Sequence, residues 1–83
     1  MMQNKDFFAI AKTLIDTILE LRHTDAKWLE LEYEVNSLFK SLPADLVKPV
    51  GDMFADSGAG EALYMSCSGI RYEQTQIEAV HHD

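Results

Sequence analysis

The chain is poor in the residues that form covalent cross-links and bind anions. Only one of its 83 residues, Cys67, is a cysteine, so an intramolecular disulfide is excluded and nothing indicates an oxidising compartment. Lysine and arginine together number 7, against 14 aspartates and glutamates, which gives a net charge of −7. A field of this sign repels phosphate groups, so direct binding to nucleic acid or to anionic membranes is disfavoured.

Long hydrophobic runs are also missing. The first residues lack the basic segment and the uninterrupted apolar stretch of a signal peptide, and Lys12, Asp16 and Glu20 break the apolar residues that follow. A membrane-spanning helix needs about 20 predominantly apolar residues in succession, and the sequence offers no such stretch. We therefore expect a cytoplasmic protein that does not enter a membrane.

Motifs for catalysis and cofactor binding are scarce. Residues 58–60 lack the later glycine of a dinucleotide-binding loop, and no Lys-Ser or Lys-Thr pair follows them. One thiol and the histidines His23, His81 and His82 cannot provide the closely spaced ligands of a structural zinc site. A free cysteine is usually a small buried apolar residue, which is the simpler interpretation of Cys67. We expect no enzyme activity, no cofactor and no metal.

An amphipathic pattern in the first part of the chain predicts a helix from about residue 4 to residue 23. Asn4 is its expected N-cap, and Arg22 and His23 suit the negative end of the helix dipole. At about 100° per residue, one stripe collects Phe7, Ile10, Ala11, Leu14, Ile18 and Leu21, with Phe8, Ile15 and Leu19 on its flank. This apolar arc covers about half of the helix, which is wider than packing against one neighbour requires.

A second helix is expected from about residue 26 to residue 41, after a break and N-cap at Thr24 and Asp25. Its apolar seam consists of Trp28, Leu31, Val35, Leu38 and Leu42, joined by Phe39. The short connection between the two helices favours an antiparallel helical hairpin. The expected core contains Leu14, Ile18, Trp28, Leu31, Val35 and Leu38.

The rest of the chain is less regular. Pro43 can open a third helix, but Pro49 and Gly51 predict that it is kinked or in two pieces. A loop is expected at residues 56–60. Residues 61–80 favour a helix, with a β-hairpin that turns at Ser68 and Gly69 as the alternative, and residues 81–83 are expected to fray. The prediction is a single all-α domain over residues 1–83 with three to four helices, and an α+β fold is the alternative.

Candidate binding residues come from two patterns. Leu29 and Tyr33 project away from the apolar seam of the second helix, and Glu30 and Glu34 form a like-charged pair four residues apart. A solvated face explains the glutamates most simply, whereas a partner with a basic surface would explain why such a pair is kept. Asp52 and Asp56 belong to the most acidic part of the chain, residues 43–83. The predicted partner-binding residues are Leu29, Tyr33, Glu30, Glu34, Asp52 and Asp56.

These observations favour a non-enzymatic protein-interaction module, which inhibits or modulates a protein partner by covering its surface. Small size, acidity and missing catalytic motifs are shared by phage or plasmid inhibitors of nucleic-acid-acting and defence proteins, a likeness of type and not of residues. The alternative is a structural or assembly protein that only completes a homo-oligomer. The wide apolar arc favours a homodimer. In a competing account, the C-terminal segment covers Phe8, Ile15 and Leu19 and leaves a monomer.

Overall fold

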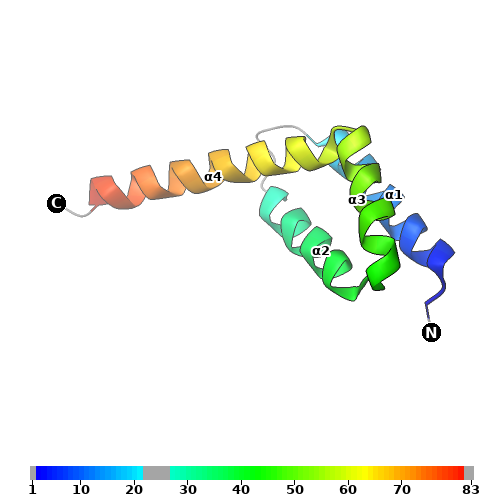
Figure 1. The fold of residues 1–83 in the computed structure, drawn as a ribbon. Helices are drawn as coiled ribbons and strands as arrows, with labels where there is room; N and C mark the ends of the chain where they lie inside the picture. The colour runs from blue at the N-terminus through cyan, green and yellow to red at the C-terminus, as the bar shows by residue number, and fades with distance from the viewer. Residues whose placement is uncertain (1, 22–26, 82–83) are drawn as a thin grey trace.

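The described part of the chain forms four helices, α1 (Asn4–Glu20), α2 (Trp28–Ser41), α3 (Ala44–Asp56) and α4 (Ala59–His81) (Figure 1). The structure is a computed structural model that describes residues 2–21 and 27–81, with side chains described as far as residue 76. No strand occurs within these ranges. The all-α prediction is therefore confirmed. The alternative β-hairpin around Ser68 and Gly69 is wrong, because both residues lie inside the continuous helix α4.

The helices α1 and α2 run antiparallel, as the short connection between them predicted (Figure 1). Phe7 near the start of α1 and Ser41 at the end of α2 line one hollow, whereas Thr17 and Lys27 line another. The two helices are therefore in contact along most of their length. Both also pack against α4, and α1 packs against α3 as well.

The helix ends differ slightly from the predicted ones. Gln3, not Asn4, is the N-cap of α1, and its backbone N–H donates a hydrogen bond to the Asp6 carboxylate at 2.9 Å. This carboxylate also lies at the positive end of the helix dipole. α2 begins two residues later than predicted. α1 ends at Glu20 with Leu21 as its extended C-cap, so the prediction that the helix continues to residues 22–23 is wrong. The expected cap at residues 24–25 lies outside the described residues.

The third helix is not in two pieces, because α3 continues through Pro49. The kink expected at this residue stays a prediction. Proline removes one backbone hydrogen bond from a helix interior, but Leu46, Val50 and Phe54 on the same helix are all buried and hold it against the body. The predicted loop at residues 56–60 is also shorter than expected. Only two residues separate α3 from α4, and one of them, Gly58, has a φ of 78°, which favours glycine.

One core is shared by all four helices. Its largest fully buried side chains are Trp28, Ile18, Val50 and Cys67. Of the six predicted core residues, five are buried, and Leu14 is half-buried and packs against the others. The rings of Phe39 and Phe54 connect α2 to α3 with a centroid distance of 5.6 Å. The remaining buried apolar residues are Phe7, Ala11, Ile15, Leu31, Val35, Leu38, Leu42, Leu46, Ala59 and Leu63.

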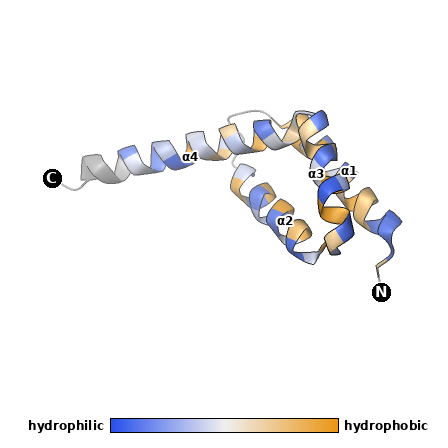
Figure 2. Ribbon diagram, viewed as in Figure 1, coloured by the Kyte–Doolittle hydropathy of each residue, from blue (hydrophilic) through white to orange (hydrophobic). Residues whose placement is uncertain are grey.

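The C-terminal part of α4 projects from this four-helix body (Figure 1). We call residues 71–81 the arm. All side chains described in it, those of residues 71–76, are exposed. Residues 71–76 of the arm are mostly hydrophilic, whereas apolar and polar residues alternate around the helices of the body (Figure 2). The molecule measures 53 × 22 × 18 Å with a radius of gyration of 15.0 Å, against about 12 Å for a compact domain of this length.

Among the helices within the described ranges, none combines the length and the apolar character needed to cross a membrane.

A candidate protein-binding groove between α1 and α2

A groove with a volume of about 410 Å³ lies between α1 and α2. The lining residues recur at spacings of three and four, which places them on one face of each helix. The two faces meet along the groove. On one side the lining consists of Met2, which precedes α1, and of Phe7, Ile10 and Leu14 of α1. On the other side it consists of Tyr33, Glu34, Ser37, Leu38 and Ser41 of α2.

Most of this lining is apolar and part of it is open to solvent. Phe7 and Leu38 are buried, whereas Met2 is 45% exposed, Ile10 is 40% exposed and Tyr33 is 72% exposed. Burial of apolar surface is favourable by roughly 25 cal/mol per Å². Covering these open side chains would therefore stabilise a complex with a partner. The buried lining residues are already held in place by the core.

A second hollow continues along the same two helices. It has a volume of about 190 Å³ and is lined by Thr17, Lys27, Glu30, Leu31 and Glu34. Because Glu34 lines both hollows, they form one surface that is apolar at the end near the N-terminus and charged at the other end. We call this surface, lined by the residues of both hollows, the α1–α2 groove.

Two of the three charged side chains that line the α1–α2 groove are acidic. Glu30 and Glu34 are both exposed and one helical turn apart on α2, and Lys27 lies at the far end. Like charges at this spacing repel each other by a few tenths of a kcal/mol. A cationic group bound between the two carboxylates would remove this repulsion.

The six residues predicted to bind a partner do not all lie on one surface of the structure. Tyr33 and Glu34 line the groove and Glu30 lines its charged end. Leu29 is half-buried and packs against the core, so it is only partly available to a partner. The other two predicted residues, Asp52 and Asp56, are exposed on α3, and the Asp52 carboxylate pairs with the ammonium group of Lys48 at 3.2 Å.

Sequence reasoning missed the α1 side of the groove. Phe7, Ile10 and Leu14 were assigned to the centre of the apolar stripe and thus to the core. The available signal was the width of that stripe, which is greater than the neighbouring helices can cover. The small residues Ser37 and Ser41 gave no signal, because their place in the groove depends on how α1 packs beside them.

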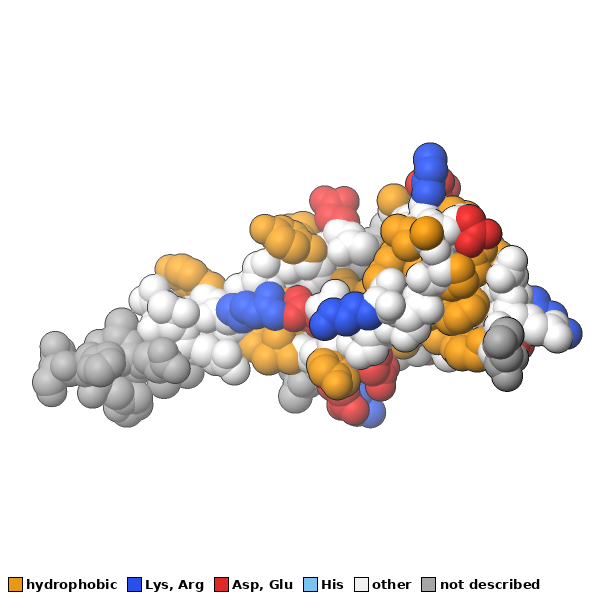
Figure 3. All heavy atoms as spheres, turned by 60° about the horizontal axis from the view of Figure 1, so that its bottom comes forward, with side chains coloured by type: hydrophobic (Ala, Val, Ile, Leu, Met, Phe, Trp, Pro, Cys, Tyr) orange, Lys and Arg blue, Asp and Glu red, His pale blue; other side chains and the backbone are white. Residues whose placement is uncertain are grey.

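Space-filling views place most of the visible apolar surface on the body. Figure 3 shows hydrophobic side chains gathered toward the end of the body that carries the N-terminus, with acidic and basic side chains around them. Among the large apolar residues, Tyr64, Met65 and Tyr72 of α4 are more than half exposed.

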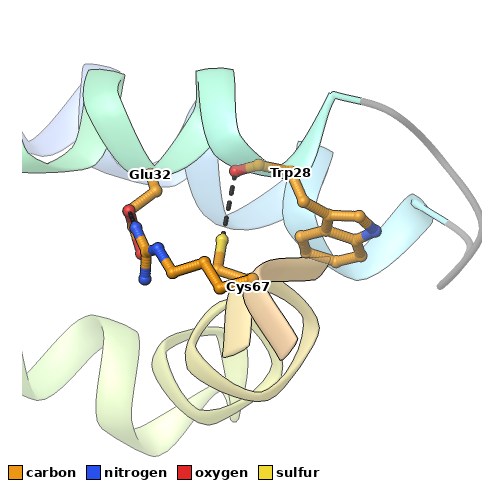
Figure 4. Close-up of polar contacts among 4 residues, drawn as sticks. Trp28, Glu32 and Cys67 are labelled. Carbon is orange, nitrogen blue, oxygen red and sulfur yellow. Dashed lines mark hydrogen bonds and ion pairs between the residues drawn. The ribbon is translucent and has the colours of Figure 1, made fainter. Parts of the chain in front are cut away.

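The single thiol lies in the core where α4 meets α2. Cys67 is fully buried, and its thiol donates a hydrogen bond to the carbonyl oxygen of Trp28 at 3.3 Å (Figure 4). The side chain of Glu32 lies on the same side of α2 (Figure 4) and forms an ion pair with Arg71 at the start of the arm. Burial raises the pKa of the Cys67 thiol, and the negative charge of Glu32 raises this pKa further. The interpretation of Cys67 as a small buried apolar residue is therefore confirmed.

Within the part of the chain that the structure describes, no three histidine, cysteine, aspartate or glutamate side chains are grouped so that they could hold a metal ion. No protein family, curated protein sequence or solved structure matches this chain.

Proposed function

We propose that the chain is a non-enzymatic protein-binding module whose α1–α2 groove receives a protein partner. The observation that carries the proposal is the groove of about 410 Å³ with Tyr33 at its rim, 72% exposed. Aromatic side chains beside a desolvated pocket are typical anchors of protein interfaces. An apolar groove bordered by polar residues is also a common sign of an interaction site.

The charge of the chain supports a partner with a basic surface. The net charge is −7, and Glu30 and Glu34 lie along the groove. Opposite charges on two surfaces accelerate their encounter and fix their relative orientation. The module would inhibit or modulate its partner by covering this basic surface, such as the site of a nucleic-acid-acting or defence protein. A cytoplasmic location belongs to the same proposal.

Affinity capture with the tagged chain from a lysate of its source cell tests this function. The wild type is compared with Tyr33→Glu, and Tyr64→Glu is the matched control because Tyr64 is equally exposed, at 72%, but lies on α4. We expect one partner that is retained by the wild type and by Tyr64→Glu and lost with Tyr33→Glu. Raising the salt concentration should weaken the capture, because salt screens exposed charges. A partner held equally by all three proteins would contradict a role for the groove.

A second candidate function is homo-oligomer assembly, which the arm favours. The side chains of residues 71–76 are all exposed, and Arg71 is tied to the body by its ion pair with Glu32. A helical segment with so little buried surface is marginal on its own. In the competing account, the C-terminal segment covers Phe8, Ile15 and Leu19 and leaves a monomer. Ile15 is buried and Phe8 packs on the core, but Leu19 is 54% exposed. Apolar surface on α1 therefore remains exposed and available for contact with a second copy of the chain.

Sedimentation equilibrium at micromolar concentration tests the assembly. A dimer of the 9.4 kDa chain that dissociates when Tyr72→Glu is introduced in the arm would support assembly through α4. A dimer lost only with Leu19→Glu would place the interface on α1. A monomeric mass at all concentrations would reject the assembly candidate and leave the groove as the functional surface.

A further inference from the structure

The α1–α2 groove has the length of a helix-binding site. On α2 its lining extends from residue 27 to residue 41, a distance of about 21 Å at 1.5 Å per residue, or about four helical turns. A volume of about 410 Å³ at the apolar end provides room for the apolar face of a segment and not for a whole domain. An extended, narrow occupant therefore fits better than a compact one.

The two sides of the groove are also suited to a helical occupant. Helices pack when the side-chain ridge of one lies in the groove of another, and the i, i+3, i+4 rows of α1 and α2 form such a groove. On α2 the small side chains of Ser37 and Ser41 lie next to the larger Leu38. Small residues allow close approach of a neighbouring helix, and Ile10 and Tyr33 provide apolar surface on either side.

The charges define the chemistry of the occupant. The apolar end has one charged lining residue, Glu34, and the other end adds Glu30 and Lys27. We infer that the occupant is a single amphipathic helix of a partner protein, about four turns long, whose apolar stripe lies between α1 and α2 and whose basic residues meet Glu30 and Glu34. This inference rests on the function proposed above and specifies the partner segment.

Fluorescence anisotropy with designed peptides and the full-length chain tests this inference. The probe is a labelled 16-residue helical peptide with leucines at i, i+3, i+4 and i+7 and lysines at most other positions. A second peptide contains glutamates in place of the lysines, and a third has the lysine peptide's composition with the leucines scrambled. The chain variants are Tyr33→Ala and Glu34→Lys, with Tyr64→Ala and Glu73→Lys as matched controls on α4.

We expect the lysine peptide to bind the wild type and the two α4 controls equally, and the scrambled peptide to bind at least about tenfold more weakly. Tyr33→Ala and Glu34→Lys should each weaken binding by about tenfold, and Glu34→Lys should improve binding of the glutamate peptide. Equal affinity for the lysine and scrambled peptides would overturn the helical occupant. A loss with Glu73→Lys as large as with Glu34→Lys would show attraction to net charge alone and would also overturn the inference.

The same peptides separate this inference from the proposed function. If a partner is captured through the groove but its cross-linked segment is not a basic helix, the function stands and the inference fails. If the lysine peptide displaces a second copy of the chain in sedimentation velocity, and Tyr33→Glu also dissociates that dimer, the occupant is the chain itself. That result would overturn the inference and support assembly.

Discussion

The two parts of α4 differ in how they are stabilised. In the first part, Ala59, Leu63 and Cys67 recur every four residues and are all buried against the other helices. In the arm, the side chains of residues 71–76 are exposed on every side of the helix. Burial therefore fixes the first part. The described part of the arm is held by local hydrogen bonds, such as that from Thr75 Oγ1 to the carbonyl oxygen of Arg71 at 2.9 Å, and by the ion pair of Arg71 with Glu32 of α2. One helix thus contains both a structural segment and a segment free to contact another molecule.

The largest expected difference concerns side-chain truncation. Leu31 is 5% exposed and packs in the core, so Leu31→Ala should lower the free energy of unfolding by about 2–5 kcal/mol. Tyr72 in the arm is 66% exposed, and Tyr72→Ala should change the free energy of unfolding by less than about 0.5 kcal/mol. Urea denaturation followed by circular dichroism measures both. Similar losses for the two variants would show that the arm is packed in solution.

Proline substitution tests whether the arm unfolds independently of the body. Met65 lies in the first part of α4 and its side chain is 61% exposed, so the effect of Met65→Pro is confined to the backbone. It should cost about 3 kcal/mol or more. Gln74→Pro in the arm should reduce helicity but leave the urea midpoint of the body unchanged. A urea midpoint that falls equally with both substitutions would show that the arm and the body unfold together.

A smaller effect is expected from the buried thiol. The raised pKa of Cys67 means that the unfolded chain loses the thiol proton first, so stability should fall as pH rises through 9.0, the ordinary value. Cys67→Ala should remove this part of the pH dependence. The free energy of unfolding is measured for both proteins at pH 8 and pH 10. An identical decrease in the two proteins would show that Cys67 ionises freely in the folded state.

The smallest expected effect belongs to the ion pair between Glu32 and Arg71, at the boundary between body and arm. Both partners are partly exposed, and such pairs contribute little because water and salt screen them. A double-mutant cycle with Glu32→Gln and Arg71→Gln should give a small stabilising coupling that decreases with salt. The Lys48–Asp52 pair, with both side chains more exposed, is the matched control and should give a still smaller coupling. A larger coupling at Lys48–Asp52 would contradict this order.

The sequence predicted the fold better than the site. The periodic apolar residues of α1 and α2 define their own buried faces, because spacings of three and four on a helix determine which side chains can pack together. The two separate pieces expected around Pro49 are wrong. Proline removes one backbone hydrogen bond, but Val50 and Phe54, one helical turn apart, are both buried and hold α3 against the body.

The groove was only half predictable for a related reason. Tyr33 was found because it lies outside the apolar seam of α2, and Glu34 because it forms a like-charged pair with Glu30. Ile10 lies at the centre of the stripe on α1, yet it is 40% exposed, because α2, α3 and α4 together do not cover the whole arc. Which part of a wide stripe stays open depends on how the helices are placed relative to one another. Periodicity within one helix does not contain this information.

The central claim is that the α1–α2 groove, and not the arm, is the surface that contacts a partner protein. It is tested most directly by photo-cross-linking in the source cell, with a photoreactive amino acid placed at position 33 or, in a separate protein, at position 72 of the arm. We predict one cross-linked heterologous protein at position 33 and none at position 72. A heterologous product only at position 72, or a product at position 33 that contains only a second copy of the chain, would contradict the account.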